Sequence, residues 1–255
     1  MKTIILVAAH KPAWMPDDPV YLPLHVGAEG KPSLAFARDD RGDQISRKNP
    51  NYCELTGLYW AWKNLPSDAL GLAHYRRHFA RRGLGGKRSR ILRSDEIEAL
   101  LSRCDVLLPA PRHYLIETNW SQYAHAHHEQ DLRCTREILE ARYPAYLAAF
   151  DRVMRRTWGH RFNMFIMRRA LADAYCAFLF DVLGCLEQRL DLSGYSPNDA
   201  RVFGFVGERL LDVWLEQNAV PYRDVPYVFL GKQNWLRKGG AFLCRKFLPR
   251  HTQSA

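Results

Sequence analysis

Several features that identify common protein classes are missing from this 255-residue chain. Neither G-x-G-x-x-G nor G-x-x-x-x-G-K occurs, which argues against dinucleotide binding and P-loop chemistry. No apolar run approaches the roughly 18 residues that a membrane-spanning helix needs. The apolar start, residues 4–9, is too short for a signal peptide and leads into His10 and Lys11 rather than a cleavage site. The six cysteines are scattered without a C-x-x-C pair, so we expect a reduced, cytoplasmic protein.

Positive charge is what the chain has in excess. Lysine and arginine number 37 against 27 aspartates and glutamates, which gives a formal net charge of +10. This balance favours anionic partners, among them nucleic acid, anionic lipid headgroups and phosphorylated small molecules, without choosing between them. Hydrophobic residues make up 47% of the chain, enough for a sizeable core, and the length is that of one large domain.

Short apolar runs alternate with segments of helical periodicity along the chain. The first run is β-branched and continuously apolar, which is typical of a parallel strand buried on both faces. Because strands and helices alternate, we expect a mixed α/β domain. The expected strands are residues 4–9, 21–24, 68–73, 105–109, 160–167 and 227–230. The expected helices are residues 52–62, 94–103, 127–142, 143–153, 170–190 and one that follows a turn at 195–201, whereas residues 112–123 are expected to be irregular.

Titratable and cationic side chains directly follow two of the expected strands. Residues 68–73 run into His74-Tyr75-Arg76-Arg77-His78, and residues 4–9 run into His10-Lys11. An open α/β sheet places its ligand at the carboxyl ends of its strands, and paired arginines can hold phosphate oxygens bidentately. The pattern predicts a cleft for an anionic small molecule. The alternative is a strand that simply ends in a solvated basic loop.

Three other segments each allow more than one interpretation. His127, His128 and Asp131 are expected on one helical face, where they would form part of a metal site or hydrogen-bond a substrate. The basic, glycine-rich residues 81–93 are expected to form a mobile loop, which is either a solvated surface or a segment that covers an anionic substrate or touches an anionic membrane. The basic, amphipathic tail, residues 231–255, is either a peripheral membrane contact or an ordinary packed helix.

Six segments spread over residues 4–215 carry a pattern that is specific when they are taken together. They read AAHKPAWMPDDPVYLPLHVGAEG, GDQISRKNPNYCELTGLYWAWKN, LGLAHYRRHF, HHEQDL, NMFIM and ARVFGFVGERLLDVWL. The chain thereby resembles a domain of unknown function found in bacterial capsular and exopolysaccharide synthesis proteins, a family associated with glycosyltransferases, including galactofuranosyltransferases. The resemblance implies a single glycosyltransferase-A-like α/β domain over residues 1–230, with a central, mostly parallel sheet flanked by helices.

The same resemblance implies a reaction. A sugar, galactofuranose as the family-level expectation, would pass from a UDP-sugar donor to the lipid-linked or oligosaccharide acceptor of a growing O-antigen or capsule, with inversion. Related folds usually bind a metal through Asp-x-Asp, a motif that does not occur here. The equivalent place after residues 70–73 holds His74, Arg76 and Arg77, so we expect cationic side chains to replace the ion, although Glu129 and Asp131 keep a Mn or Mg site open.

Site residues follow from the matching motifs. The general base would be Glu208, which matches the family's G-F-x-x-E-R-L pattern, or else Asp199 or Asp131. Glu54 in the aromatic helix is either a structural ion pair or a further group of the site. Donor and substrate contacts would come from His10, Lys11, Asp43, Asn49, His74, Arg76, Arg77, His127, Asn163 and Arg201.

Two other classes of protein stay open. A nucleic-acid-binding protein would explain the charge and the aromatic residues, but the basic residues do not line one helix or strand and no recognition module is visible. We therefore expect no nucleic-acid partner. The other class is a non-catalytic scaffold of a polysaccharide assembly complex. A lipid-linked acceptor would favour peripheral contact with the cytoplasmic face of the inner membrane.

Overall fold

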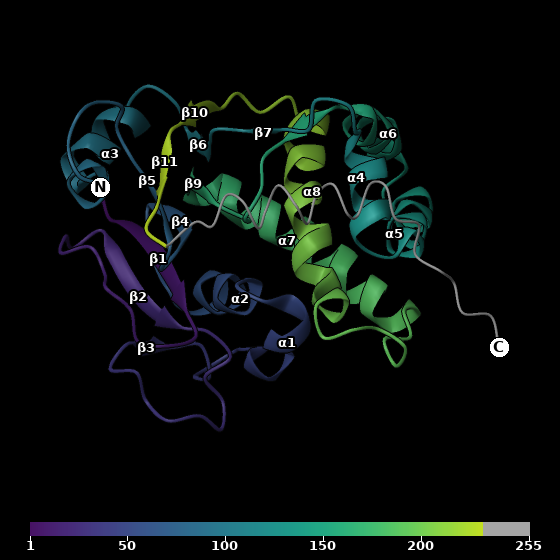
Figure 1. Ribbon diagram of the computed structural model, residues 1–255, viewed down its shortest axis with the longest axis horizontal. Coiled ribbons are helices and arrows are strands. Elements are labelled where there is room, and N and C mark those ends of the chain that lie inside the picture. Colours follow the sequence, from purple (N-terminus) through teal and green to yellow (C-terminus); the bar gives the residue numbers. More distant parts are fainter. Residues whose placement is uncertain (232–255) are drawn as a thin grey trace.

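The computed structural model describes residues 1–231, and a central sheet with strand order β10-β6-β9-β4-β1-β2-β3 organises them (Figure 1). β1 (Thr3–Ala9) pairs in parallel with β2 (Tyr21–His25) on one side and β4 (Ala69–His74) on the other. β3 (Ala37–Arg38) continues in parallel beyond β2, and β10 (Arg223–Val225) pairs in parallel with β6 (Val106–Pro109). Only β9 (Phe165–Arg168) interrupts this path, antiparallel to both β4 and β6. The sheet is mostly parallel, as predicted.

Short antiparallel strands extend the sheet where β4 ends. β5 (Arg77–Phe79) folds back on β4 at the pair His74 and Arg77, and β11 (Tyr227–Phe229) pairs with β5. A separate two-stranded sheet joins β7 (Arg112–His113) to β8 (Trp158–Gly159). The expected strand at 227–230 is confirmed, whereas β10 was not expected from the sequence.

The central strands β1, β4, β6 and β9 are buried on both faces, as their apolar sequences predict. Along β1, Ile5 and Val7 belong to one hydrophobic cluster and Leu6 and Ala8 to the other. Successive side chains of a strand point to opposite faces, so a continuous apolar run serves two cores. Because both faces of the sheet are covered, polar side chains of these strands reach solvent only at the strand ends.

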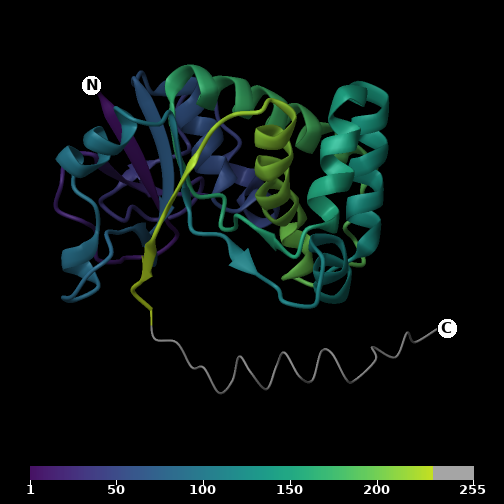
Figure 2. The ribbon, with the colours of Figure 1, turned by 90° about the horizontal axis from the view of Figure 1, so that it is seen from above.

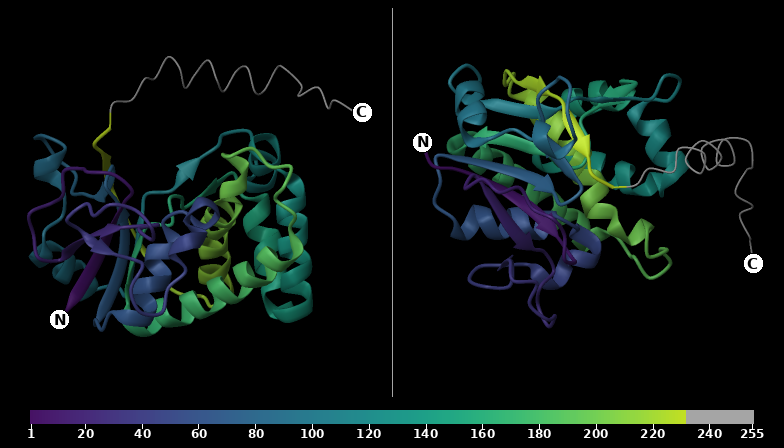
Figure 3. Two further views of the ribbon diagram at one scale, coloured as in Figure 1. Left: turned by 90° about the horizontal axis from the view of Figure 1, so that it is seen from below. Right: turned by 60° about the vertical axis from the view of Figure 1, so that its left-hand side comes forward.

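Helices cover the two faces unequally. α3 (Ser94–Leu101) lies on one face, and α2 (Leu55–Asn64) and α7 (Arg169–Arg189) lie on the other. A second group of helices packs against α7, on the side of the molecule away from the N-terminal strands (Figures 2 and 3). It consists of α4 (Asn119–Ala126), α5 (Glu129–Arg142), α6 (Leu147–Arg155) and α8 (Val202–Gln217). No helix within residues 1–231 is both long and apolar enough to cross a bilayer.

The local predictions for residues 160–167 and 112–123 were wrong. Residues 160–167 do not form one strand, because β9 begins only at Phe165, and Phe162 and Asn163 adopt left-handed backbone with φ of 75° and 52°. Residues 112–123 are not irregular throughout, since α4 begins at Asn119. The start of α4 is stabilised by Thr118, whose hydroxyl accepts a hydrogen bond from the Ser121 amide at 3.1 Å. The tail, apart from Gly231, lies outside the described residues.

His78 of β5 is fully buried, with the rings of Trp14 and Tyr21 edge-on to its own at centroid distances of 6.2 and 6.1 Å. Burial lowers the pKa of His78 from 6.5 to about 4. Between these pH values the unfolded chain binds the proton that the folded chain excludes. The contribution of His78 to stability is therefore complete above about pH 6.5 and is lost as the pH falls toward about 4.

We expect the unfolding free energy to fall by roughly 2–3 kcal/mol because of His78 when the pH is lowered from about 7 to about 4.5. Urea unfolding of the wild-type chain and of His78→Phe at both pH values measures the effect. The variant removes the titrating group from an aromatic pocket, so its loss of stability on acidification should be smaller by that amount. An equal loss in both proteins would show that His78 is not responsible.

Candidate active site

A polar cavity of about 520 Å³ lies at the carboxyl ends of β1 and β4. The two strands are in register there, with Ala8 opposite His74, so the residues that follow each strand meet at one edge of the sheet. The other sides are closed by α1 (Asn49–Tyr52) with the two residues before α2, by the segment before β9 and by the first two turns of α8. The lining consists of Ala8, His10, Val26, Asn49, Pro50, Cys53, Glu54, His74, Tyr75, Arg76, Arg77, Phe162, Arg201, Phe205 and Glu208.

Three arginines give the polar cavity its positive charge. Each guanidinium lies over an aromatic ring: Arg77 over Phe162 at 4.1 Å, Arg76 over Tyr75 at 5.1 Å and Arg201 over Phe205 at 5.2 Å. None of the three forms an ion pair with a carboxylate of residues 1–231. Stacking fixes the planes of the guanidinium groups while leaving N–H groups to a ligand, although Nε of Arg201 already donates a hydrogen bond to Sγ of Cys53 at 3.1 Å. The arrangement suits an anion with several oxygens.

Burial and neighbouring charge change the pKa values of two side chains that line the cavity. Burial, followed by the charge of Arg76, lowers the pKa of Arg77. Burial, followed by the charges of Lys11 and Arg76, also lowers the pKa of His10, which favours its neutral form near pH 7. Cationic groups gathered so closely repel one another, and a bound anion would relieve that repulsion. The electrostatics thus point to the same class of ligand as the geometry.

Two carboxylates face the same cavity. Glu208 is 17% exposed; its Oε1 accepts a hydrogen bond from the Phe162 amide at 2.9 Å, and its Oε2 lies 3.8 Å from Nη1 of Arg209. Glu54 is 11% exposed, and its Oε1 accepts a hydrogen bond from Nδ2 of Asn163 at 2.6 Å. Both side chains are held in place but retain part of their hydrogen-bonding capacity. Either one is therefore available to accept a proton from a ligand.

His74 is connected to both carboxylates of the cavity, to Glu54 directly and to Glu208 through Phe162. Its Nε2 lies 2.6 Å from the Phe162 carbonyl oxygen, and because a carbonyl only accepts, Nε2 carries the hydrogen. The same Nε2 is 3.9 Å from Oε1 of Glu54. The amide of Phe162 holds Glu208 while its carbonyl holds His74, so one residue positions side chains on both sides of the cavity.

Strained backbone surrounds the polar cavity. Cys53 and Phe162 line it with φ of 54° and 75°, and Asn163, directly behind Glu54, has φ of 52°. Left-handed backbone is uncommon for residues other than glycine, and such residues cluster at functional sites. Three of them around one cavity support a functional role for it.

α8 supplies one wall because two of its glycines let it approach closely. Arg201, Phe205 and Glu208 are spaced at four and three residues and share a helical face. A Cβ atom at Gly207 would lie 2.9 Å from Cδ1 of Leu55, and one at Gly204 would lie 3.1 Å from Sγ of Cys53. The absence of side chains at these two positions brings the face of α8 against the start of α2.

Seven of the residues predicted from the sequence line the polar cavity: His10, Asn49, His74, Arg76, Arg77, Arg201 and Glu208. Lys11 lies beside it, with Nζ 5.9 Å from the centroid of the Tyr75 ring. Asn163 is behind the wall, where its amide group orients Glu54. His127 is also behind the wall and stacks on Phe205 with the ring centroids 4.2 Å apart.

The structure does not bring three other predicted residues to the polar cavity. Both carboxylate oxygens of buried Asp131 accept hydrogen bonds from tyrosine hydroxyls, Tyr123 and Tyr195, at 2.6 Å each. Asp199 accepts from Ser196 Oγ at 2.8 Å and interacts with His127 at 3.1 Å. Asp43 lies at the far end of α2, where its Oδ1 accepts from the Tyr59 hydroxyl at 3.1 Å. All three side chains thus interact with other parts of the protein and not with the cavity.

The expected common helical face of His127, His128 and Asp131 does not exist. α4 ends at Ala126 and α5 begins at Glu129, so the two histidines lie between helices. Their rings stack on different partners, His127 on Phe205 and His128 on Tyr195, so the two side chains do not share a face. No group of three His, Cys, Asp or Glu side chains within residues 1–231 is placed to hold a metal ion.

Sequence reasoning missed part of the lining. The sequence did not decide whether Glu54 has a structural or a functional role. It also did not single out Cys53, Tyr75, Phe162 and Phe205 as site residues. Tyr75 lies between two predicted residues and Phe205 belongs to the G-F-x-x-E-R-L pattern, so a signal was present for both. Phe162 carries no such signal, because its backbone amide and carbonyl contacts and the position of its ring under Arg77 all arise from the tertiary structure.

The chain is similar to a protein family and to a solved structure. Residues 4–219 match the family model described as Domain of unknown function (DUF4422). No curated protein sequence matches the chain. Among solved structures, the apo structure of the WbbM bifunctional glycosyltransferase is similar, with 28% sequence identity and a TM-score of 0.84 over 91% of this chain and 46% of that one. The chain thus spans about half the length of that protein, and the likeness confirms the predicted α/β fold class.

Proposed function

The chain belongs to the family described as Domain of unknown function (DUF4422), and from this premise and the geometry of the polar cavity we propose that it is a glycosyltransferase. The observation that carries the proposal is the pairing of three arginines free of ion pairs within residues 1–231 with two carboxylates in one cavity. Transfer of a sugar from a nucleotide needs both, since one group must stabilise the leaving phosphates and another must accept a proton. The similarity to a bifunctional glycosyltransferase supports the same conclusion.

The arginines would bind the diphosphate of the donor. Arg76, Arg77 and Arg201 line a cavity of about 520 Å³, and their guanidinium groups retain N–H donors for a ligand. Negative charge develops on the leaving diphosphate as the glycosidic bond breaks, and fixed cations in a partly buried site stabilise that charge. The chemistry that a divalent ion supplies in related folds would then come from side chains.

Glu208 would act as the general base. Its Oε1 is held by the Phe162 amide, and an acceptor hydroxyl that approaches the polar cavity would deliver its proton to the carboxylate as it attacks the anomeric carbon. The bond from that carbon to the diphosphate oxygen breaks as the new glycosidic bond forms, with inversion. His10 and His74, which line the cavity, would hydrogen-bond the sugar or the nucleotide.

The finer identity of the substrates rests on the resemblance of the sequence segments. We propose UDP-galactofuranose as the donor and a lipid-linked or oligosaccharide acceptor of a growing O-antigen or capsule. The residues of the polar cavity support an anionic donor in general and do not distinguish one sugar from another.

Calorimetric titration of the protein with UDP, in the presence of Mn and in the presence of a chelator, tests the proposal. We expect binding in both conditions, because arginines rather than an ion would hold the diphosphate. Binding only with Mn would contradict the metal-free site. Binding in neither condition would contradict the nucleotide-sugar proposal and favour a non-catalytic scaffold.

A further inference from the structure

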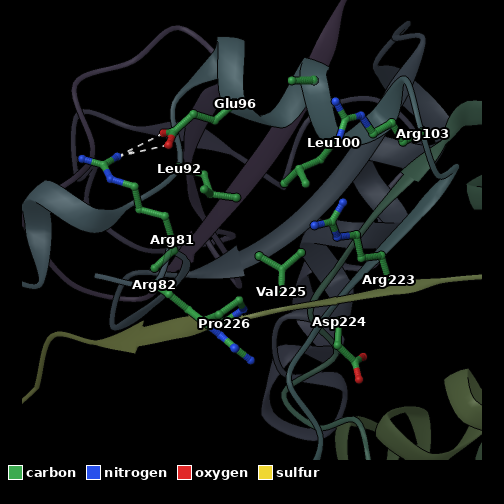
Figure 4. Close-up of a pocket in the computed structure, with 12 residues that line it drawn as sticks. Arg81, Arg82, Leu92, Glu96, Leu100, Arg103, Arg223, Asp224, Val225 and Pro226 are labelled. Atoms are coloured by element: carbon green, nitrogen blue, oxygen red, sulfur yellow. Dashed lines mark hydrogen bonds and ion pairs between the residues drawn. The ribbon is translucent and has the colours of Figure 1, made fainter. Parts of the chain in front are cut away.

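A second concave surface, which we call the arginine groove, lies between the loop that follows β5, helix α3 and strand β10 (Figure 4). Its volume is about 660 Å³. The floor is apolar and includes Leu92, Leu100 and Val225. Four arginines border it, and none of them lines the polar cavity: Arg81, Arg82, Arg103 and Arg223.

The charge of the arginine groove is not balanced from within. Arg81 is paired with Glu96 at 3.2 Å, as Figure 4 shows, but Arg82, Arg103 and Arg223 form no ion pair with residues 1–231. The other carboxylate at the rim, Asp224, interacts with Nε2 of His160 at 3.0 Å. A surface with unpaired arginines around an apolar floor matches a ligand that is both anionic and apolar.

The loop of residues 81–93 borders the groove and presents an apolar tip. Its ends are joined by the bridge between Ala80 and Ile91 and by the hydrogen bond from the Arg81 amide to the Arg90 carbonyl at 2.9 Å. Leu84 at the tip is completely exposed, at 103%. Single exposed apolar side chains are common on protein surfaces, so Leu84 indicates a lipid contact only together with the basic residues and the apolar groove floor beside it.

Basic residues surround that tip in sequence. Arg82 precedes it, and Lys87, Arg88 and Arg90 follow it. The guanidinium of Arg88 lies 4.6 Å from the ring of Trp14, which is itself 38% exposed. Apolar side chains that enter the headgroup region, combined with lysines and arginines that attract anionic lipids, are the elements of interfacial membrane binding.

We propose that the loop of residues 81–93 and the arginine groove dock on an anionic lipid bilayer. Leu84 enters the boundary between headgroups and acyl chains, while Arg82 and Lys87 contact lipid phosphates and the groove accommodates one headgroup with the start of its acyl chain. Nucleic acid fits less well, because single strands need aromatic platforms for stacking, Leu84 provides none and the ring of Trp14 already lies against the guanidinium of Arg88. The docking surface does not depend on the proposed glycosyltransferase activity.

Docking would also set the position of the polar cavity. The loop follows β5 directly, and Arg77 at the start of this three-residue strand lines the cavity. Three residues of strand span about 10 Å, so a docked loop holds the cavity close to the headgroups. If the proposed function is correct, the cavity would thus lie within reach of an acceptor attached to lipid.

Co-sedimentation of the full chain with two kinds of vesicle tests the proposal. One kind contains phosphatidylglycerol and phosphatidylcholine in equal parts, and the other contains phosphatidylcholine alone. The variants are Leu84→Ser and the double variant R82Q/K87Q. The matched control is R133Q/R155Q, which removes the same charge from exposed positions on α5 and α6. Thermal unfolding confirms that each variant is folded.

We expect the wild-type chain to bind the anionic vesicles and not the neutral ones. R82Q/K87Q should lower the affinity by about 25-fold, about fivefold for each charge removed near the surface. Leu84→Ser should lower the affinity on the order of tenfold, because serine lacks the apolar surface whose burial in the bilayer favours binding. R133Q/R155Q should bind like the wild type.

Four results would overturn the proposal. The first is that the wild-type chain fails to sediment with anionic vesicles. Equal losses in R82Q/K87Q and R133Q/R155Q would mean that only net charge matters, and unchanged binding in both loop variants would assign membrane contact to another part of the chain. Binding of an oligonucleotide that R82Q/K87Q abolishes, without vesicle binding, would assign the surface to nucleic acid instead.

Discussion

Replacing Glu208 by glutamine is expected to lower the turnover number by a factor of about 10²–10⁴, the usual contribution of a general base. Glutamine has the same shape, and its side-chain oxygen can still accept the hydrogen bond that the Phe162 amide donates to Oε1 of Glu208 at 2.9 Å. The cavity should therefore keep its form and lose only the proton acceptor. Turnover with a UDP-sugar and an acceptor measures the effect, and UDP titration should show nearly unchanged affinity.

Glu54→Gln is the matched control, because Glu54 is the other carboxylate that lines the polar cavity. Its hydrogen bond from Asn163 and its distance of 3.9 Å from His74 suggest that it orients neighbours, so we expect a smaller loss of turnover. The reverse order, with the larger loss in Glu54→Gln, would identify Glu54 as the base. Full activity in both variants would contradict a carboxylate base in this cavity.

Arg77→Gln is expected to weaken UDP binding by a factor on the order of 10–150, the range for losing hydrogen bonds to a charged group. Arg77 lies in the wall of the polar cavity over the Phe162 ring and has no ion pair within residues 1–231, so the variant should remove a ligand contact without leaving a buried carboxylate unpaired. Calorimetric titration with UDP measures the change.

Uridine provides the control ligand for this experiment, because it carries the base and the ribose without the phosphates. Its affinity should be the same for the wild-type chain and Arg77→Gln. A parallel loss of uridine binding would indicate that Arg77 shapes the nucleoside pocket or the fold. A UDP affinity that does not change would remove Arg77 from the proposed diphosphate site.

The general form of the fold could be predicted from local sequence patterns. Residues 4–9 and 68–73 appear in the structure as β1 and β4, side by side and parallel, because a continuous apolar run has favourable surroundings only between two covered faces. Their polar continuations, His10 and the segment from His74 to Arg77, consequently meet at one edge. This part of the polar cavity follows directly from the strand pattern.

The predictions that failed concern segments whose conformation is set by distant partners. His127 and His128 have a sequence compatible with a helix, but each ring stacks on a residue about 70 positions later in the chain. Residues 160–164 alternate like a strand, yet Phe162 and Asn163 adopt left-handed backbone where they contact Glu208 and Glu54. Local propensity is a weak force, and these tertiary contacts outweigh it.

The amino-acid sequence by itself determined the alternation of strands and helices, the excess of positive charge and the position of the cationic residues at the strand ends. These are properties of neighbouring residues, governed by burial and backbone geometry. Only the tertiary structure decided which carboxylates join the arginines, because Glu54 and Glu208 reach the polar cavity while Asp43 and Asp131 have local hydrogen-bond partners elsewhere. That choice depends on where α8 crosses the start of α2, and the packing at Gly204 and Gly207 sets that crossing.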